Sequence, residues 1–216
     1  MKRDSETTYI FSLIAEGEHI RQDFKFEISD ARKIAKTLSA FANTQGGRLL
    51  VGVKDNGRIA GVSSEEEAYM IEAAATLYCQ PSVGFTTESY RVEGRTVFVV
   101  EIPESPDKPV YAKDEQGKLW AYLRVADENI LATPVHLRIW QQSGDRQGEL
   151  LSFTEHERQL LHHLQEQGPL SLNRCCRLAR LSRSTTEQLL ARLIRYDIVE
   201  PVFENHRFTF QLVHSN

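Results

Sequence analysis

Arginines recur at every third residue in one stretch near the C-terminal end of the sequence, at Arg174, Arg177, Arg180 and Arg183. The next turn of chain carries hydroxyl and amide side chains at Ser184, Thr185, Thr186 and Gln188. Arginine guanidinium groups pair with phosphate oxygens, while hydroxyl and amide groups hydrogen-bond to the edges of bases. The pattern therefore predicts a nucleic-acid contact, most simply with duplex DNA. The alternative is a solvated helix face followed by a helix cap.

The elements predicted to carry these side chains are three helices and a β-hairpin. Capping boxes at Thr154-x-x-Glu157 and Ser184-x-x-Glu187 start the first and third helices, and Ser171 starts the second. Residues 198–212 then read as two short strands around a polar tip. This order resembles the winged-helix regulators of bacteria, in which the third helix enters the major groove and the hairpin flanks it. Because such regulators commonly read paired half-sites, a homodimer is expected.

The N-terminal two thirds of the chain mixes helical and strand patterns, which predicts an α+β fold. Apolar residues recur at helical spacing from Ala31 to Ala42, and Gly46-Gly47 ends that helix. The apolar run of residues 49–53 predicts a strand buried on both faces. Further elements expected from the pattern are a hairpin partner at 58–62, a helix capped by Ser64-x-x-Glu67, two strands within 92–102 and a strand at 119–125.

Five blocks of this part of the chain follow one another in a familiar order. They are Glu18-x4-Asp23-Phe24-Lys25, Ala40-Phe41-Ala42-Asn43-Thr44-x-Gly46-Gly47, the glycine-containing segment 50–62, Pro109-Val110-Tyr111, and Tyr122-x-Arg124-Val125-x3-Asn129. Together they resemble the Schlafen-type, AlbA-like DNA-binding domain over residues 14–132. The resemblance implies a mixed sheet with helices, and nucleic acid as the partner.

The same resemblance implies roles for individual residues. In animal Schlafen proteins this domain is built around carboxylates that support RNA cleavage, which carries that role onto Glu18, Asp23 and Asp55. Such a site would hold Mg²⁺ or Mn²⁺, which polarises the phosphate and generates the attacking hydroxide. Asp23 stands where the family pattern usually has Glu, so its oxygens are displaced. The alternatives are a solvated Glu18, a paired Asp23 and a turn-forming Asp55.

Two basic residues in these blocks are candidates for contacts with a nucleic-acid backbone. They are Lys25 and Arg124, for which an intramolecular ion pair is the alternative. The sequence contains neither a G-x4-G-K-[ST] loop nor a G-x-G-x-x-G motif, so we expect no nucleotide cofactor.

Composition limits the classes of protein that remain. The net charge is −4, and the three cysteines, Cys79, Cys175 and Cys176, form no metal-ligand spacing. An odd number of cysteines fits the reducing cytoplasm, and no apolar run is long enough for a membrane span. Residues 1–151 carry 18 Lys+Arg against 23 Asp+Glu, while residues 152–216 carry 8 against 7. A nucleic-acid footprint must therefore be a local patch.

The sequence predicts two domains, residues 1–140 and 152–216, joined by a polar, glycine-containing linker at 141–151. The first functional hypothesis is a non-enzymatic DNA-binding protein, a bacterial transcriptional regulator, whose N-terminal domain helps to bind nucleic acid or to dimerise. The alternatives are a metal-dependent ribonuclease of Schlafen type and a non-catalytic assembly module.

Overall fold

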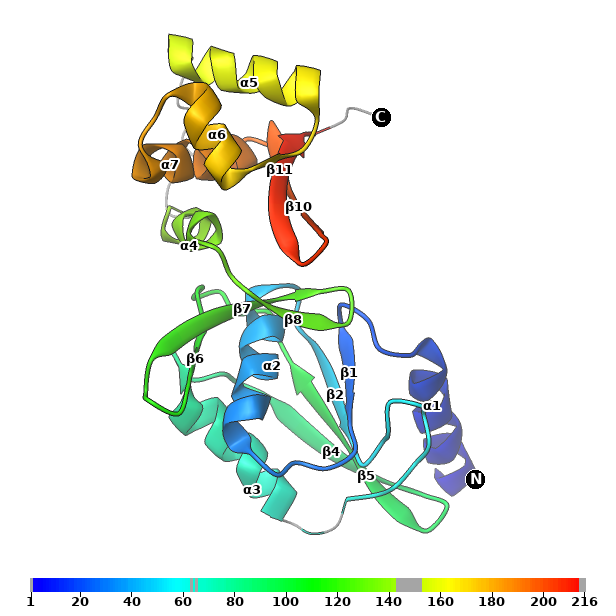
Figure 1. The fold of residues 1–216 in the computed structure, drawn as a ribbon. Coiled ribbons are helices and arrows are strands. Elements are labelled where there is room, and N and C mark those ends of the chain that lie inside the picture. Colours follow the sequence, from blue (N-terminus) through cyan, green and yellow to red (C-terminus); the bar gives the residue numbers. More distant parts are fainter. Residues whose placement is uncertain (1, 63, 65, 143–152, 214–216) are drawn as a thin grey trace. The chain divides into compact units, whose positions relative to one another are not determined.

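The computed structural model describes residues 2–62, 64, 66–142 and 153–213. The chain divides into two compact units, Met1–Leu131 and Ala132–Asn216 (Figure 1). Helix α4 (Pro134–Gln141) falls within the predicted first domain, but it packs on α7 (Arg183–Arg195) of the second unit. Most of the predicted linker lies outside the described residues. The predicted α+β class is confirmed, since helices and sheets are mixed in both units.

The first unit contains two four-stranded sheets and three helical segments. Its helices are α1 (Lys2–Glu16), α2 (Ala31–Asn43), α3 (Glu66–Ala73) and, continuing α3, the π-helical η1 (Ala74–Tyr78). Its strands are β1 (Gln22–Lys25), β2 (Gly47–Val51), β3 (Cys79–Gln80), β4 (Thr86–Val92), β5 (Arg95–Ile102), β6 (Tyr111–Lys113), β7 (Leu119–Val125) and β8 (Glu128–Leu131). No described helix is both long and apolar enough to cross a membrane.

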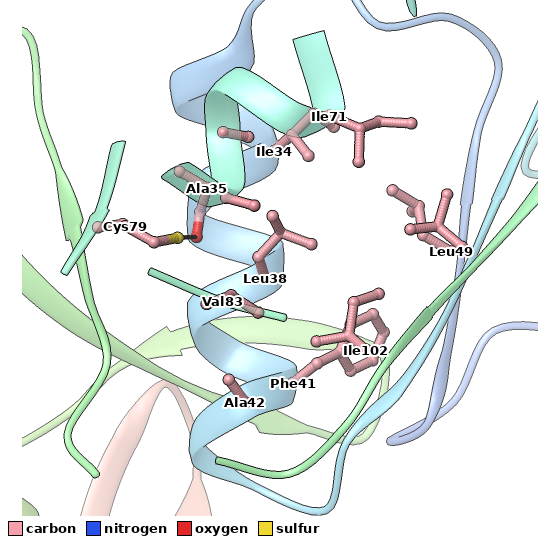
Figure 2. Close-up of a cluster of buried hydrophobic side chains, with 14 of the residues drawn as sticks. Ile34, Ala35, Leu38, Phe41, Ala42, Leu49, Ile71, Cys79, Val83 and Ile102 are labelled. Atoms are coloured by element: carbon pink, nitrogen blue, oxygen red, sulfur yellow. Dashed lines mark hydrogen bonds between the residues drawn. The ribbon is translucent and has the colours of Figure 1, made fainter. Parts of the chain in front are cut away.

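The first sheet has the order β1-β2-β5-β4, with β1 parallel to β2 and the other pairs antiparallel. Alternate residues of β2 belong to different cores: Leu49 and Val51 pack with α2, while Leu50 packs on the opposite face of the sheet with α1. The prediction of a strand buried on both faces is therefore confirmed. Figure 2 shows the α2 side of this core, where Leu38 and Phe41 lie among residues of β2, β5, α3 and η1.

The second sheet, β3-β6-β7-β8, is antiparallel throughout and lies against α2. Nine of the thirteen residues of α2 are buried, including polar residues of its second half. Asn43 Nδ2 donates to the carbonyl oxygens of Val110 (2.8 Å) and Tyr122 (3.0 Å), and Asn43 Oδ1 accepts from the Val110 N–H (2.7 Å). Ser39 Oγ donates to the same Val110 oxygen and accepts from the Tyr122 N–H. Side chains of α2 thus hydrogen-bond to backbone groups at the second sheet.

A close crossing of two loops explains the glycine at Gly52. The carbonyl oxygen of Gly52 accepts hydrogen bonds from the N–H groups of Ala60 and Gly61, and a Cβ added at Gly52 would lie 2.9 Å from the Gly61 carbonyl carbon. Gly52 also has φ +94, which only glycine adopts readily. The prediction of a strand at 58–62 is wrong: only an isolated bridge joins Val53 to Ile59, because the chain crosses over Gly52 instead of running beside it.

Glu67, at the start of α3, makes a hydrogen bond far from its own helix. Ser64 Oγ accepts from the Glu66 N–H (3.2 Å), as expected of a helix start. The Glu67 carboxylate accepts a hydrogen bond from the N–H of Ile28 (3.2 Å), 39 residues away. This tertiary bond gives the buried Ile28 N–H a partner.

The second unit adds α5 (Glu155–Gln167), α6 (Leu172–Ala179) and α7, followed by the hairpin β10 (Val199–Glu204) and β11 (Arg207–Leu212). The short strand β9 (Leu170–Ser171) pairs with β11 to complete a sheet of order β10-β11-β9. The Thr154–Glu157 capping box is confirmed. The predicted Ser184 cap is wrong: Ser182 caps α7 by accepting from the Thr185 N–H, so the helix starts at Arg183.

We expect Asn43→Ala to lower the free energy of unfolding of the first unit by about 3 kcal/mol, because backbone groups of Val110 and Tyr122 would lose a buried partner. Urea unfolding in a Trp140→Phe background measures this, since the fluorescence then reports Trp120 on β7. Gln45→Ala, at an exposed position just after α2, should change the free energy by less than about 0.5 kcal/mol. Equal effects of the two substitutions would contradict the role assigned to Asn43.

Candidate functional site

The structure brings two of the three predicted carboxylates together at the start of β1. Asp23 is 3% exposed, and the carboxyl group of Glu18 is hydrogen-bonded to it. Glu18 Oε1 also accepts from the N–H of Phe24 (2.9 Å), which fixes the side chain against the strand. Asp55 instead lies exposed in the turn after β2. Within the described residues, no three His, Cys, Asp or Glu side chains are placed to hold a metal ion together.

Two cations compensate the buried carboxylate. Asp23 Oδ1 lies 3.2 Å from Arg124 Nη2, and Asp23 Oδ2 lies 2.8 Å from Lys25 Nζ, at ion-pair distance but outside hydrogen-bond geometry. Lys25 Nζ also donates to the Phe24 carbonyl oxygen. For both Lys25 and Arg124 the structure contains the intramolecular ion pair that was the alternative to a nucleic-acid contact.

Arg124 is 2% exposed and joins β7 to β1. Its guanidinium donates to the carbonyl oxygens of His19 and Gln22, to Asp23 and to Asn129 Oδ1 (2.9 Å). The guanidinium carbon lies 5.2 Å from the centre of the Phe41 ring. Since its donors point into the domain, Arg124 positions the Asp23 carboxylate and does not present a charge to solvent.

The carboxyl groups of Glu18 and Asp23 have pKa values shifted in opposite directions. Burial, followed by the hydrogen bond with Asp23, raises the pKa of Glu18 to about 7, although the Phe24 N–H and Lys25 act in the opposite direction. Burial would raise the pKa of Asp23, but the Glu18 hydrogen bond and the charges of Lys25 and Arg124 outweigh it and hold that pKa below its usual range. Below about pH 7, Glu18 therefore donates a proton to the Asp23 carboxylate in a hydrogen bond.

This environment does not fit a Mg²⁺ or Mn²⁺ ligand set. Hard divalent cations need several ionised or carbonyl oxygens directed at one point. Here one carboxyl group keeps its proton up to about pH 7, and both oxygens of the other face a cation of the protein. Asp55 adds no third ligand within the described part of the chain.

The second unit gathers most of the predicted nucleic-acid contacts around α6 and α7, and it exposes all of these but Thr186. Arg177, Arg180, Arg183, Ser184, Thr185 and Gln188 are exposed. Thr186 is fully buried, and its hydroxyl donates to the Ser182 carbonyl oxygen. Arg180 closes α6 in the left-handed conformation, with φ +53.

A buried carboxylate ties α4 to the start of α7. Glu187 is 6% exposed, and its two oxygens accept from Arg138 Nε (3.2 Å) and Arg183 Nε (3.1 Å). Arg138 Nη2 also donates to Ser184 Oγ (3.0 Å). Ser184 and Arg183 are therefore already engaged within the unit. The sequence alone does not indicate Arg138, because its partners lie 46 and 49 residues further along the chain.

Comparisons with known proteins bear on the first unit. The family model described as Schlafen, AlbA_2 matches residues 18–133, more than half of the chain. The chain belongs to the Schlafen, AlbA_2 family. The matched segment begins at Glu18 and includes Asp23, Lys25, Asn43 and Arg124. A search among curated proteins gives no match to this chain.

Two solved structures are similar to the chain in part. The DIP2311 protein from Corynebacterium diphtheriae is 20% identical with a TM-score of 0.45, and the match covers 66% of this chain but only 29% of that one. The N-terminal domain of a putative ATP-dependent DNA helicase RecG-related protein from Nitrosomonas europaea is 25% identical with a TM-score of 0.41, with 70% of this chain and 97% of that chain covered.

The raised pKa of Glu18 predicts a pH-dependent stability. The folded chain keeps this proton up to about pH 7, whereas the unfolded chain releases it near 4.5, so the free energy of unfolding should fall as the pH rises between these values. Glu18→Gln should abolish this fall, because the amide can donate to Asp23 and still accept from the Phe24 N–H. Urea midpoints between about pH 5 and 8 measure it.

Glu27→Gln, at an exposed position near β1, provides the control and should keep the pH dependence of the parent. The low pKa of Asp23 acts in a separate window: its stabilisation is lost only as the pH falls below the ordinary value of 3.8. A Glu18→Gln protein with the pH dependence of the parent would contradict the shared proton.

Proposed function

We propose that this protein is a nucleic-acid-binding protein whose second unit is a winged helix that reads duplex DNA, in the role of a bacterial transcriptional regulator. In this arrangement α7 enters the major groove, and the β10–β11 hairpin lies beside it as the wing. The first unit, as a member of the Schlafen, AlbA_2 family, assists nucleic-acid binding.

The observation that carries the proposal is the set of exposed side chains where α6 meets α7. Arg177 and Arg180 lie on α6 and at its end, and Thr185 and Gln188 follow on the first turns of α7. Arginines at a helix junction suit phosphate contacts, and a glutamine on the N-terminal half of a recognition helix suits the adenine edge. Thr186 is no longer a candidate for these contacts, because it is buried. Arg183 and Ser184 stay in the proposal, since both are exposed while they hydrogen-bond to Glu187 and Arg138.

The hairpin supports the same arrangement. Its two strands are joined by Asn205 and His206, both with positive φ, which gives a tight two-residue turn. Arg207 is exposed at the start of β11, directly after this tip. A short, rigid hairpin with an exposed arginine can reach a phosphate next to the groove that α7 occupies. Two copies of the chain would read two half-sites, so we include a homodimer in the proposal.

The ribonuclease alternative has less support. Lys25 and Arg124 compensate the charge of Asp23, and Glu18 keeps its proton up to about pH 7. The pair therefore needs no bound metal ion to be stable. We therefore assign this pair to the stability of β1 and not to phosphodiester hydrolysis.

Replacing Arg177 by Gln together with Arg180 by Asn tests the proposal, since Asn tolerates the left-handed conformation at position 180. We expect weaker binding to a mixed-sequence duplex, and a smaller dependence of log K on log salt, by about 0.9 for each phosphate that the variant no longer binds. Fluorescence anisotropy at several salt concentrations measures both quantities.

Arg91→Gln with Arg158→Gln removes the same charge from exposed positions on β4 and α5 and should leave the binding unchanged. Selection from a randomised duplex library adds a test of base reading: Gln188→Ala should lose or change the sequence that the parent enriches. If the variants at positions 177, 180 and 188 behave as the parent does, duplex recognition by α6 and α7 is excluded.

A further inference from the structure

The strand β4 forms a long open edge of the first sheet. In the order β1-β2-β5-β4 it pairs on one side with β5, and no described strand pairs with its other side. Its seven residues keep a continuous antiparallel register with β5 and include no proline. All of them except Val92 are exposed or half-buried. An edge of this length and regularity is a template on which another strand can pair.

The hairpin turn decides which backbone groups of β4 face outward. Residues 93–94 form a two-residue turn in which both have positive φ, so Val92 and Arg95 on either side of it exchange hydrogen bonds. Pairs with and without hydrogen bonds alternate along an antiparallel ladder. The N–H and C=O groups that point away from β5 therefore belong to alternate residues, Thr87, Ser89 and Arg91.

A hydrogen bond on the far side of β5 supports this assignment. The Thr96 carbonyl oxygen accepts from the Val62 N–H (2.8 Å), so it does not point at β4. Thr96 lies opposite Arg91 in the ladder. In a pair without hydrogen bonds, each residue directs its backbone groups away from the other. Arg91 therefore directs its own groups to the open edge of β4.

The other edge strands of the described sheets are shorter or interrupted. Strands β1 and β8 have four residues each, and β3 and β9 have two. Strand β10 has six residues but contains Pro201, which has no N–H to donate. Short strands and prolines are common means of protecting a sheet edge from further pairing. Strand β4 has neither.

We propose that β4 pairs with β4 of a second copy of this chain, antiparallel and about a twofold axis at Ser89. Ser89 is the middle residue of the strand and its backbone groups face outward, so all seven residues of one copy then lie opposite residues of the other. The two four-stranded sheets join into one. This inference deepens the proposed function, on which it rests for the homodimer, by naming the surface that joins the copies.

The side chains of β4 suit this register. Thr87 lies opposite Arg91 of the second copy, and Glu88 lies opposite Tyr90, so no like charges face each other. The Tyr90 hydroxyl donates to Glu88 within one chain, and the same acceptor faces it across the axis. A register centred on Glu88 would place two carboxylates opposite each other, which is unfavourable. A register centred on Tyr90 would leave Thr87 opposite the turn residue Glu93.

Aromatic rings beside the edge favour a second copy over an unrelated peptide. Tyr90 lies on the face of the sheet that α1 covers. Tyr9 of α1 is 39% exposed, and its ring centre lies 5.3 Å from that of Tyr90. Across the axis the two Tyr90 residues are diagonal neighbours, which aromatic side chains can bridge. A second copy therefore adds its own Tyr9 and Tyr90 to the contact, whereas an unrelated strand adds only backbone hydrogen bonds.

The mass of the full chain in solution tests the proposal. Sedimentation equilibrium at about 100 μM should give about twice the 24.7 kDa of one chain. Ser89→Pro should reduce this to the mass of one chain, because it removes the outward N–H at the axis without removing a bond to β5. A parent protein that is monomeric at this concentration would overturn the proposal.

Two charge variants keep the test independent of whether the sheet tolerates proline. Ser89→Lys and Ser89→Glu should each weaken the dimer about fivefold, because like charges then meet at the axis. An equimolar mixture of the two proteins should form a dimer at least as tight as that of the parent, since opposite charges then meet. Misfolding of either variant would not be reversed by mixing.

Gln116→Lys and Gln116→Glu, at an exposed position in the turn between β6 and β7, are the matched controls. They should dimerise as the parent does, both alone and mixed. A dimer that Ser89→Pro and the charge variants leave unchanged, or a mixture that fails to recover the dimer, would show that the copies join through another surface. Equal effects at positions 89 and 116 would contradict the proposal as well.

The Arg177→Gln, Arg180→Asn variant separates this inference from DNA reading. Both substitutions lie in the second unit, so this variant should lose duplex binding and keep the mass of the parent. If the second unit binds no DNA, sedimentation without DNA still decides whether β4 joins two copies. A monomeric parent that binds duplex DNA through α6 and α7 would overturn the β4 pairing and leave DNA reading in place.

Discussion

The polar edge of α2 is the constraint on which the first unit depends. A helix packed between two sheets would ordinarily present only apolar residues, but α2 meets the second sheet with Ser39 and Asn43. These side chains hydrogen-bond to backbone groups of Val110 and Tyr122. The second sheet is therefore positioned by directional bonds, and its register relative to α2 is fixed more narrowly than apolar packing alone would fix it.

Arg124 extends the same constraint across the unit. The Arg124 N–H donates to Thr44 Oγ1, just past the end of α2. The Arg124 guanidinium reaches β1 and donates to the Asp23 carboxylate. Removing the charge of Asp23 or Arg124 would leave the other buried without compensation, so the two act as one group, with Lys25 as a second cation of Asp23. This explains why family positions that suggest nuclease chemistry in a sequence can serve packing in this chain.

The sequence predicts those structural features that depend on residues close together along the chain. Leu49, Leu50 and Val51 indicate a doubly buried strand, and Thr154 with Glu157 indicates a helix start, because each signal is complete within a few residues. Glu67 and Arg124 differ, since their partners are 39 and 101 residues away. Thr186 shows where prediction from sequence fails even within one helix. It lies four residues after the capping Ser182, and the sequence does not tell whether its hydroxyl faces solvent or, as in the structure, the core.

The contact between Gly52 and Gly61 separates residues that the fold requires from a turn, residues 54–56, whose sequence and length can change. A Cβ at Gly52 would meet the backbone of Gly61, and a Cβ at Gly61 would meet the side chain of Arg95, so neither position accepts a side chain. The exposed residues 54–56 form a turn whose ends are held together by that contact. A peptide tag or a longer loop inserted at Asn56 would leave the crossing in place. The tip of this turn is therefore a natural insertion point for labelling the domain without disturbing its two cores.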